Sequence, residues 1–202
     1  MITTYIFDFG NVLVNFYPQK LTEPYVSDEE ERNCLAQTVF DRAVWDKLDD
    51  GTYSDREAKA EICKKLPVDK HGLACKIYDG WISNLTPVPG MSELIEDIRK
   101  KGDKKLYLLS NISRGFAENF SKTPWINDLL GNFDGLVLTG TLGIVKPARE
   151  IFEYMFDTFC LKPEECLFVD DSEKNIRGAA AAGINGYLFD GDAQRLRQEL
   201  GL

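Results

Sequence analysis

The sequence predicts an α/β fold: a Rossmann-like parallel sheet of about five strands, with a small all-helical cap inserted after the first strand. One observation is a set of short apolar runs, rich in β-branched and aromatic residues, at 5–7, 106–109, 135–138, 166–169 and 186–189. Their apolar residues are continuous rather than alternating, which is typical of strands covered on both faces. A second observation is that helical patterns separate the last four runs, which favours parallel strands joined by right-handed crossovers.

Three segments next to these runs have helical patterns. Residues 91–101 place Leu94, Ile95 and Ile98 on one face, and Gly102 follows as a stop signal. The pattern repeats over 149–159, and a short alanine-rich helix is expected over 175–182. We expect these helices to lie against the sheet.

The stretch 16–88 differs because it contains no convincing strand. Ser54 and Glu57 fit a capping box, and helices are expected near 28–40, 55–66 and 69–84. We therefore predict a cap at 16–88 and a catalytic core made of residues 1–15 and 89–202.

Bulk properties narrow the class of protein. The chain has 202 residues, is 44% apolar and carries a formal net charge of −9. Such acidity argues against non-specific binding to nucleic acid and against an anionic membrane. The five cysteines form no C-x-x-C pair, and neither a signal peptide nor a membrane-spanning run is apparent, so a cytoplasmic protein with reduced thiols is expected. The sequence does not indicate the oligomeric state.

Polar residues follow the predicted strands. Asp8 follows the first run, Ser110 and Asn111 the second, and Asp170 and Asp171 close the fourth. Lys146 lies in the loop after the third run. Ligands of open parallel sheets bind beyond the C-terminal strand ends, so these groups are expected to meet at one edge.

Each group has a catalytic and a structural interpretation. A carboxylate such as Asp8 can attack phosphorus and form an acyl phosphate, or it can cap the turn at Gly10 and Asn11. The adjacent Asp170 and Asp171 can bind a hard divalent cation, or the second can cap the next helix. Ser110 and Asn111 can donate to phosphate oxygens, or they can belong to an ordinary turn. Lys146 can neutralise phosphate charge, or it can be a solvated surface lysine.

The joint pattern resembles the haloacid dehalogenase-like superfamily, in the subgroup with a small helical cap (subfamily IA). The matching segments are Phe7-Asp8-Phe9-Gly10-Asn11-Val12-Leu13, Leu109-Ser110-Asn111, Gly143-Ile144-Val145-Lys146-Pro147, and Val169-Asp170-Asp171-Ser172 through Asn175 to Gly178. Together with the cap they cover essentially the whole chain.

This resemblance implies a Mg²⁺-dependent hydrolase with defined roles. Asp8 is the expected nucleophile and metal ligand, with the Gly10 carbonyl and Asp171 on the same metal and Asp170 in support. Lys146 is the expected catalytic cation. The phosphate-binding residues are expected to be Ser110 and Asn111, with Asn11 and Asn175.

One position departs from the family pattern. Most phosphatases of the superfamily have a second aspartate two residues after the nucleophile as general acid and base, and this chain has Gly10. Without that aspartate, the interpretation we favour is a phosphatase for a small ester with a good leaving group, such as a sugar 1-phosphate, because its hemiacetal hydroxyl needs less protonation than an ordinary alcohol. The first motif is also similar to that of some capped sugar-1-phosphate phosphatases. The alternatives are a metal-independent 2-haloacid dehalogenase and a protein that binds a phosphorylated ligand without turnover.

The cap is expected to contact the part of the substrate beyond the phosphate. Asn15 and Tyr17 are candidates because they lie just past the first motif, and Asp46 and Lys47 are candidates in a turn after Trp45.

Overall fold

The computed structural model describes residues 1–202, and a five-stranded parallel sheet forms its core. The strand order is β5-β4-β1-β6-β7, with bounds Thr4–Phe7 (β1), Lys105–Ser110 (β4), Gly135–Leu138 (β5), Cys166–Asp170 (β6) and Asn185–Leu188 (β7). All neighbouring pairs are parallel, which confirms the predicted sheet. Because β1 is central, the residue that follows it, Asp8, lies at the middle of the C-terminal edge.

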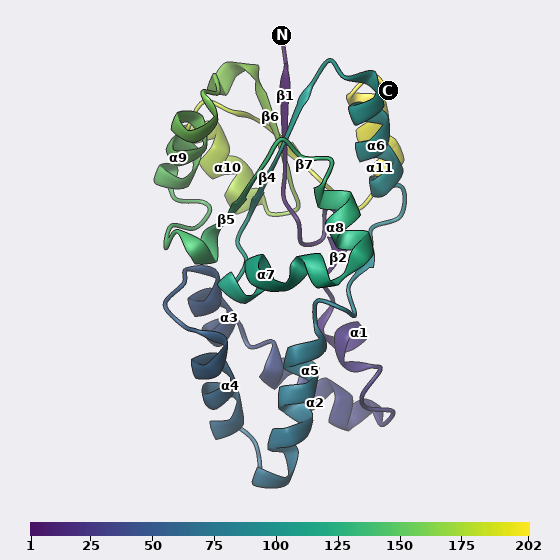
Figure 1. Cartoon of the computed structure of the whole chain (residues 1–202), viewed down its shortest axis with the longest axis vertical. Coiled ribbons are helices and arrows are strands. Elements are labelled where there is room, and N and C mark those ends of the chain that lie inside the picture. Colours follow the sequence, from purple (N-terminus) through teal and green to yellow (C-terminus); the bar gives the residue numbers. More distant parts are fainter.

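Helices cover both faces of the sheet (Figure 1). On one face are α9 (Arg149–Phe159) and α10 (Glu173–Ala181), and on the other are α6 (Met91–Lys101) and α11 (Ala193–Glu199). Alternate residues of the central strand enter different apolar clusters, since Ile6 packs with Phe152 and Phe168 while Phe7 packs with Leu94 and Leu108. This two-sided burial explains why the sequences of the inner strands are continuously apolar, whereas β7, at the edge of the sheet, is mostly exposed despite its apolar run.

Two more core helices, α7 (Arg114–Asn119) and α8 (Pro124–Leu130), follow β4. In Figure 1, α7 lies between the sheet and the helices of the cap. Short 3₁₀ turns complete the core at Phe120–Lys122, Thr139–Thr141 and Pro163–Glu165.

The cap contains α1 (Pro18–Thr22), α2 (Glu29–Val39), α3 (Arg42–Asp49), α4 (Asp55–Lys64) and α5 (His71–Gly80), with a 3₁₀ turn at Val68–Lys70. The capping box of Ser54 and Glu57 is present, as predicted. Helices α1 and α3 were not predicted from the sequence. The helix expected at 69–84 is shorter, because its first residues form the 3₁₀ turn and residues after Gly80 turn back toward the core.

The expectation that 16–88 holds no strand is wrong at one point. Val14–Asn15 (β2) pairs antiparallel with Thr86–Pro87 (β3), so the two connections between cap and core run side by side. The Asn15 amide donates to the Thr86 hydroxyl at 3.1 Å and to the Pro87 carbonyl at 3.0 Å. The proposed boundaries at 15/16 and 88/89 stay a prediction.

An aromatic cluster joins the cap to the core. The Trp45 ring lies 5.2 Å from Trp81, which lies 5.8 Å from Phe116 of α7, measured between centroids. Phe16 contacts both tryptophans. Such buried aromatic contacts favour one arrangement of the cap over the sheet edge.

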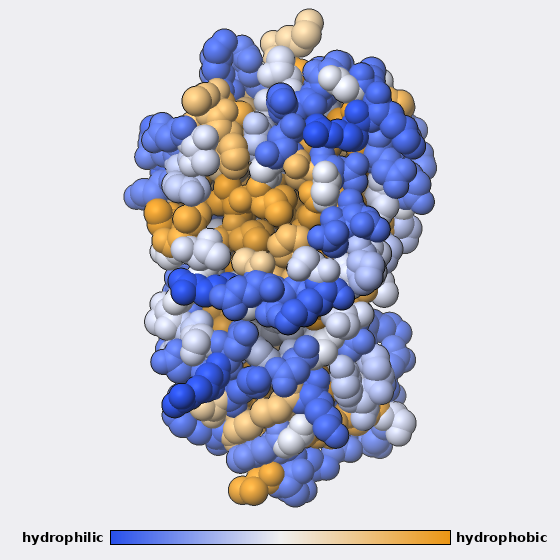
Figure 2. Space-filling view, viewed as in Figure 1, coloured by the Kyte–Doolittle hydropathy of each residue, from blue (hydrophilic) through white to orange (hydrophobic).

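The surface seen in Figure 2 is mainly hydrophilic over the cap, and its largest apolar area lies on the core half at the level of β4 and β5. None of the helices has the length and apolar character needed to cross a bilayer.

Candidate active site

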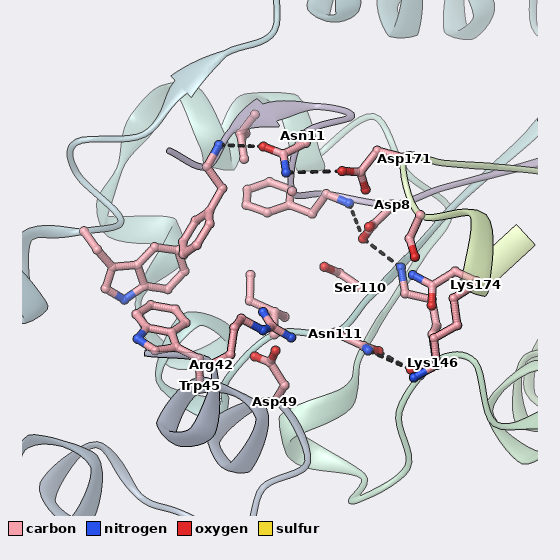
Figure 3. A pocket seen from close by; sticks show the side chains of 18 residues that line it. Asp8, Asn11, Arg42, Trp45, Asp49, Ser110, Asn111, Lys146, Asp171 and Lys174 are labelled. Atoms are coloured by element: carbon pink, nitrogen blue, oxygen red, sulfur yellow. Dashed lines mark hydrogen bonds and ion pairs between the residues drawn. The ribbon is translucent and has the colours of Figure 1, made fainter. Parts of the chain in front are cut away.

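A cavity of about 330 Å³ lies between the C-terminal edge of the sheet and the cap. Eight of the residues predicted for the site line it: Asp8, Gly10, Asn11, Ser110, Asn111, Lys146, Asp171 and Asn175. The remaining predicted residue, Asp170, lies directly behind them and is fully buried. The structure therefore brings together groups that are up to about 160 residues apart in the chain (Figure 3).

Asp8 and Lys146 form a buried ion pair. The Lys146 ammonium lies 2.9 Å from Asp8 Oδ1, and their side chains are 1% and 11% exposed. The Phe9 amide also donates to Asp8 Oδ1, at 2.7 Å. No protein group forms a hydrogen bond or ion pair with Asp8 Oδ2, so this oxygen is free to react.

Charge and burial act in opposite directions on this pair. Burial raises the pKa of Asp8 to about 7, and Lys146 opposes that shift. Burial lowers the pKa of Lys146, but Asp8 and Asp170 outweigh it, and the net shift is upward. Lys146 therefore remains charged, and a cation near Asp8 would favour the ionised carboxylate further.

Asp170 holds Lys146 from the other side. Its Oδ2 lies 2.7 Å from the Lys146 ammonium, and the Asn175 amide donates to both of its oxygens at 3.1 Å. The Ser172 amide donates to Oδ1 at 2.8 Å. Asp170 and Asn175 are thus engaged in positioning Lys146, and a direct contact of Asn175 with phosphate stays a prediction.

Three carboxylates at the strand ends fit a metal ion. Oxygens of Asp8, Asp170 and Asp171 lie within 4.8 Å of one another. Hard oxygen ligands suit Mg²⁺, which uses one or two protein carboxylates together with water and phosphate. Asn11 donates to Asp171 Oδ2 at 3.2 Å and so orients that carboxylate. The metal role of the Gly10 carbonyl stays a prediction.

Ser110 and Asn111, both expected to bind phosphate, differ in whether their side-chain polar groups are free. Ser110 is 2% exposed, lines the cavity, and its hydroxyl forms no hydrogen bond to the protein. Both ends of the Asn111 amide are used by the Lys146 backbone, as donor to its carbonyl at 3.0 Å and acceptor from its N–H at 2.8 Å. In this geometry the Asn111 side chain anchors the Lys146 loop.

Two polar residues of the cap wall of the cavity, Arg42 and Asp49, were not predicted from the sequence. Arg42, Trp45 and Asp49 of α3 line the cavity, across from Asp8 and Asp171 (Figure 3). Their i, i+3, i+7 spacing places them on one helix face, and Asp41, whose side chain accepts from the Ala43 amide, is the N-cap that signals this helix.

The cap candidates taken from the sequence lie elsewhere. Asp46 and Lys47 lie within α3 rather than in a turn, and both are exposed and outside the cavity, with Asp46 ion-paired to Arg42. Asn15 is used in the β2–β3 ladder, and Tyr17 is 53% exposed and outside the cavity. Phe16, between them, lines the cavity instead.

Comparison with known proteins agrees with this geometry. The haloacid dehalogenase-like hydrolase family matches residues 2–183. This chain belongs to that family. The family accounts for the order of the site residues along the chain, and the prediction of a hydrolase of this superfamily is confirmed.

Two relatives of this haloacid dehalogenase-like hydrolase match over nearly their whole lengths. D-ribitol-5-phosphate phosphatase of Bacteroides thetaiotaomicron is 26% identical over 99% of this chain and 97% of its own. Sesquiterpene phosphatase astK of Aspergillus oryzae is 25% identical over the full length of both chains. With the family, these relatives support a phosphatase, as the sequence predicted.

Solved structures share the fold. A HAD family enzyme of Bacteroides thetaiotaomicron, in complex with magnesium and inorganic phosphate, superposes with a TM-score of 0.74 at 23% identity, covering 97% of this chain and 99% of that one. L-2-haloacid dehalogenase of Xanthobacter autotrophicus has a TM-score of 0.70 at 16% identity, covering 100% and 83%. The fold is therefore shared by an enzyme that binds magnesium and inorganic phosphate and by a 2-haloacid dehalogenase.

Proposed function

We propose that this chain is a Mg²⁺-dependent phosphatase that hydrolyses a small phosphate ester through a phosphoaspartate on Asp8. The observation that carries the proposal is the state of Asp8. One carboxylate oxygen is fixed by Lys146 and the Phe9 amide, and the other faces the cavity without a protein partner.

The neighbouring groups suit an attack on phosphorus. Asp8 Oδ2 forms the new bond to phosphorus while the bond to the ester oxygen breaks. Lys146 and the Ser110 hydroxyl provide positive charge and a donor for the phosphoryl oxygens. Mg²⁺ held by Asp8 and Asp171 would neutralise charge on the phosphoryl group and align it.

The cavity limits the substrate to a small molecule. A volume of about 330 Å³ is at the low end of ligand pockets and suits a sugar or polyol phosphate. Arg42 and Asp49 can bind hydroxyl groups, and Trp45 and Trp81 offer aromatic surfaces. A sugar 1-phosphate is the substrate that the first motif favours, and the named relative that acts on D-ribitol 5-phosphate supports a polyol phosphate equally well.

A substrate screen tests this function. The protein is incubated with sugar and polyol phosphates and with p-nitrophenyl phosphate, with and without Mg²⁺, and released phosphate is measured. We expect Mg²⁺-dependent turnover that Asp8→Asn lowers at least about 10⁴-fold, since the nucleophile is lost. Full activity in Asp8→Asn would sink the proposal.

The same assay separates the alternatives. Chloride release from chloroacetate that is indifferent to a chelator would identify a dehalogenase. Phosphate binding without release of product from any ester would identify a binding protein. The cluster of three carboxylates is why we favour the metal-dependent phosphatase.

A further inference from the structure

Hydrolysis of an alkyl phosphate needs a group that moves protons. The departing alkoxide must be protonated, and the water that later attacks the phosphoaspartate must lose a proton. At Gly10 there is no side chain to do this, and a Cβ built there would meet no atom within 4 Å. The space beside the nucleophile is therefore empty of protein.

Most charged groups of the cavity are unsuited to the task. Lys146 is held by two carboxylates, and Asp171 belongs to the metal cluster. Arg42 does not lose its proton in proteins, and Lys174 is exposed. Apart from the nucleophile, one carboxyl group of the cavity wall remains, and it is Asp49.

Asp49 is a buried carboxylate without a partner. It is 6% exposed, lines the cavity, and forms no hydrogen bond or ion pair through either carboxylate oxygen. Figure 3 shows its carboxylate pointing into the cavity beside Arg42, on the side of Ser110 and Asn111. A carboxyl group in this state costs free energy unless it is protonated or used by a ligand.

The backbone of Asp49 is clamped to the core. The Thr139 hydroxyl donates to the Asp49 carbonyl at 2.7 Å and accepts from the Ile112 amide at 3.2 Å. Gly51, in the turn that follows, lies so close to the core that a Cβ there would be 2.7 Å from the Gly140 carbonyl. Asp49 is thus fixed relative to the strand that ends in Ser110, although it belongs to the cap.

We propose that Asp49 is the general acid and base of the reaction, supplied by the cap in place of a side chain at position 10; this inference rests on the proposed phosphatase function. In the first half, the Asp49 carboxyl gives its proton to the ester oxygen as Asp8 bonds to phosphorus, and the alcohol leaves. In the second half, the Asp49 carboxylate takes a proton from water as the water oxygen bonds to phosphorus. The bond to Asp8 then breaks, phosphate leaves, and Asp49 is again protonated.

The electrostatic surroundings fit this cycle. Burial raises the pKa of Asp49 to about 7, Arg42 opposes the shift, and Asp46 and Asp8 add to it while Lys146 opposes it. At neutral pH both protonation states are populated, which suits a residue that acts first as acid and then as base. The ester therefore need not have a good leaving group, so the preference for a sugar 1-phosphate drawn from Gly10 loses its basis.

The test compares Asp49→Asn with the parent protein, using Mg²⁺ and aryl phosphates whose phenols have pKa values from about 7 to about 10. In Asp49→Asn, we expect turnover of the poorest leaving group to fall about 10²–10⁴-fold. With p-nitrophenyl phosphate, whose leaving group needs little protonation, a burst of one nitrophenol per active site should remain and the following steady state should slow. The burst marks formation of phosphoaspartate without its hydrolysis.

Several controls make the result decisive. Asp69→Asn makes the same change at an exposed cap residue and should leave every rate unchanged. Gly10→Asp in the Asp49→Asn protein should recover at least part of the lost turnover, because the space at position 10 is free. Asp49→Ser, with thermal melting of each variant, guards against a folding defect.

Two results would overturn the inference while leaving the phosphatase function intact. One is turnover by Asp49→Asn equal to that of the parent protein with all esters. The other is an equal loss for good and poor leaving groups without a burst, which would indicate substrate binding. Failure of the phosphatase function itself looks different, because the parent protein would then release no nitrophenol and Asp8→Asn would change nothing.

Discussion

The two walls of the cavity are built differently. On the core wall, Asp8, Lys146, Asp170 and Asn175 are joined by short hydrogen bonds and ion pairs, and Asp8 Oδ2 and the Ser110 hydroxyl are left without a protein partner. On the cap wall, three of the five lining residues are aromatic (Phe16, Trp45 and Trp81), and the carboxylate of Asp49 has no partner. The linked polar groups of the core wall hold one geometry, which suits a single reaction. The polar groups of the cap wall that have no partner are available to a substrate.

Lys146→Met removes the cation of the core wall and should have the largest effect on stability and activity. Two buried carboxylates lose their cation, so we expect a destabilisation of about 3–5 kcal/mol and a loss of activity of at least about 10³-fold. Urea unfolding and phosphate release measure the two effects. Lys100→Met, on an exposed lysine of α6, is the matched control and should change neither. Equal stability of the two variants would contradict the role given to the buried network.

The pH dependence of the stability of Asp49→Asn tests whether the Asp49 carboxylate of the cap wall has no partner. The carboxyl pKa is about 7 in the folded protein and about 4 when unfolded, so the folded state binds the proton more tightly. The contribution of Asp49 to the stability of the parent protein therefore falls as pH rises from about 4 to about 7. Asp49→Asn has no carboxyl group at this position and does not show this fall. We expect Asp49→Asn to be more stable than the parent protein above pH 7, by as much as about 4 kcal/mol, with the gap closing below pH 4. Chemical denaturation at pH 4 and pH 8 measures it, and a gap of the opposite sign would argue that Asp49 is paired and ionised.

Removal and return of the metal test whether the ion is bound by the core wall and not by the cap wall. A chelator should abolish activity, and added Mg²⁺ should restore it and raise the melting temperature, since a ligand at about 100 times its Kd adds about 2.7 kcal/mol. Asp171→Asn should lose that thermal shift, because Asp171 is a proposed ligand of the ion and the exposed member of the carboxylate cluster. Asp49→Asn should keep it. A shift that survives in Asp171→Asn would place the ion elsewhere.

Arg42→Met should have the smallest effect, confined to recognition. Arg42 lines the cavity from the cap and makes no contact with the core network. We expect KM for the best sugar or polyol phosphate to rise about tenfold with little change in kcat, as for a residue that binds ground state and transition state alike. A fall in kcat with unchanged KM would assign Arg42 to the chemical step instead.

The sequence was most informative about the core wall. Each strand there is buried on both faces, so its residues are continuously apolar, and most functional groups stand where a strand ends. The positions of Asp8, Ser110 and Asp171 follow from that rule, whereas Lys146 lies farther along, in the loop after β5.

The cap wall was poorly predicted for a physical reason. Helix α3 has only eight residues, and nothing in the sequence distinguishes Arg42 and Asp49, which line the cavity, from Asp46 and Lys47, which do not. Which polar residue faces the cavity depends on how the cap is set over the sheet, through contacts such as Thr139 to the Asp49 carbonyl. Such long-range contacts leave no local pattern in the sequence.

The Asn11 side chain has a consequence that reaches beyond the metal site. Its oxygen accepts from the Phe16 amide at 3.1 Å, where the chain leaves for the cap, and its nitrogen donates to Asp171 at 3.2 Å. One amide group thus contacts both the connection to the cap and the carboxylate proposed to bind the metal. A swing of the cap that pulls Phe16 away also loosens the group that orients Asp171. By thermodynamic reciprocity, an ion that fixes Asp171 would favour the arrangement of the cap described here by the same free energy.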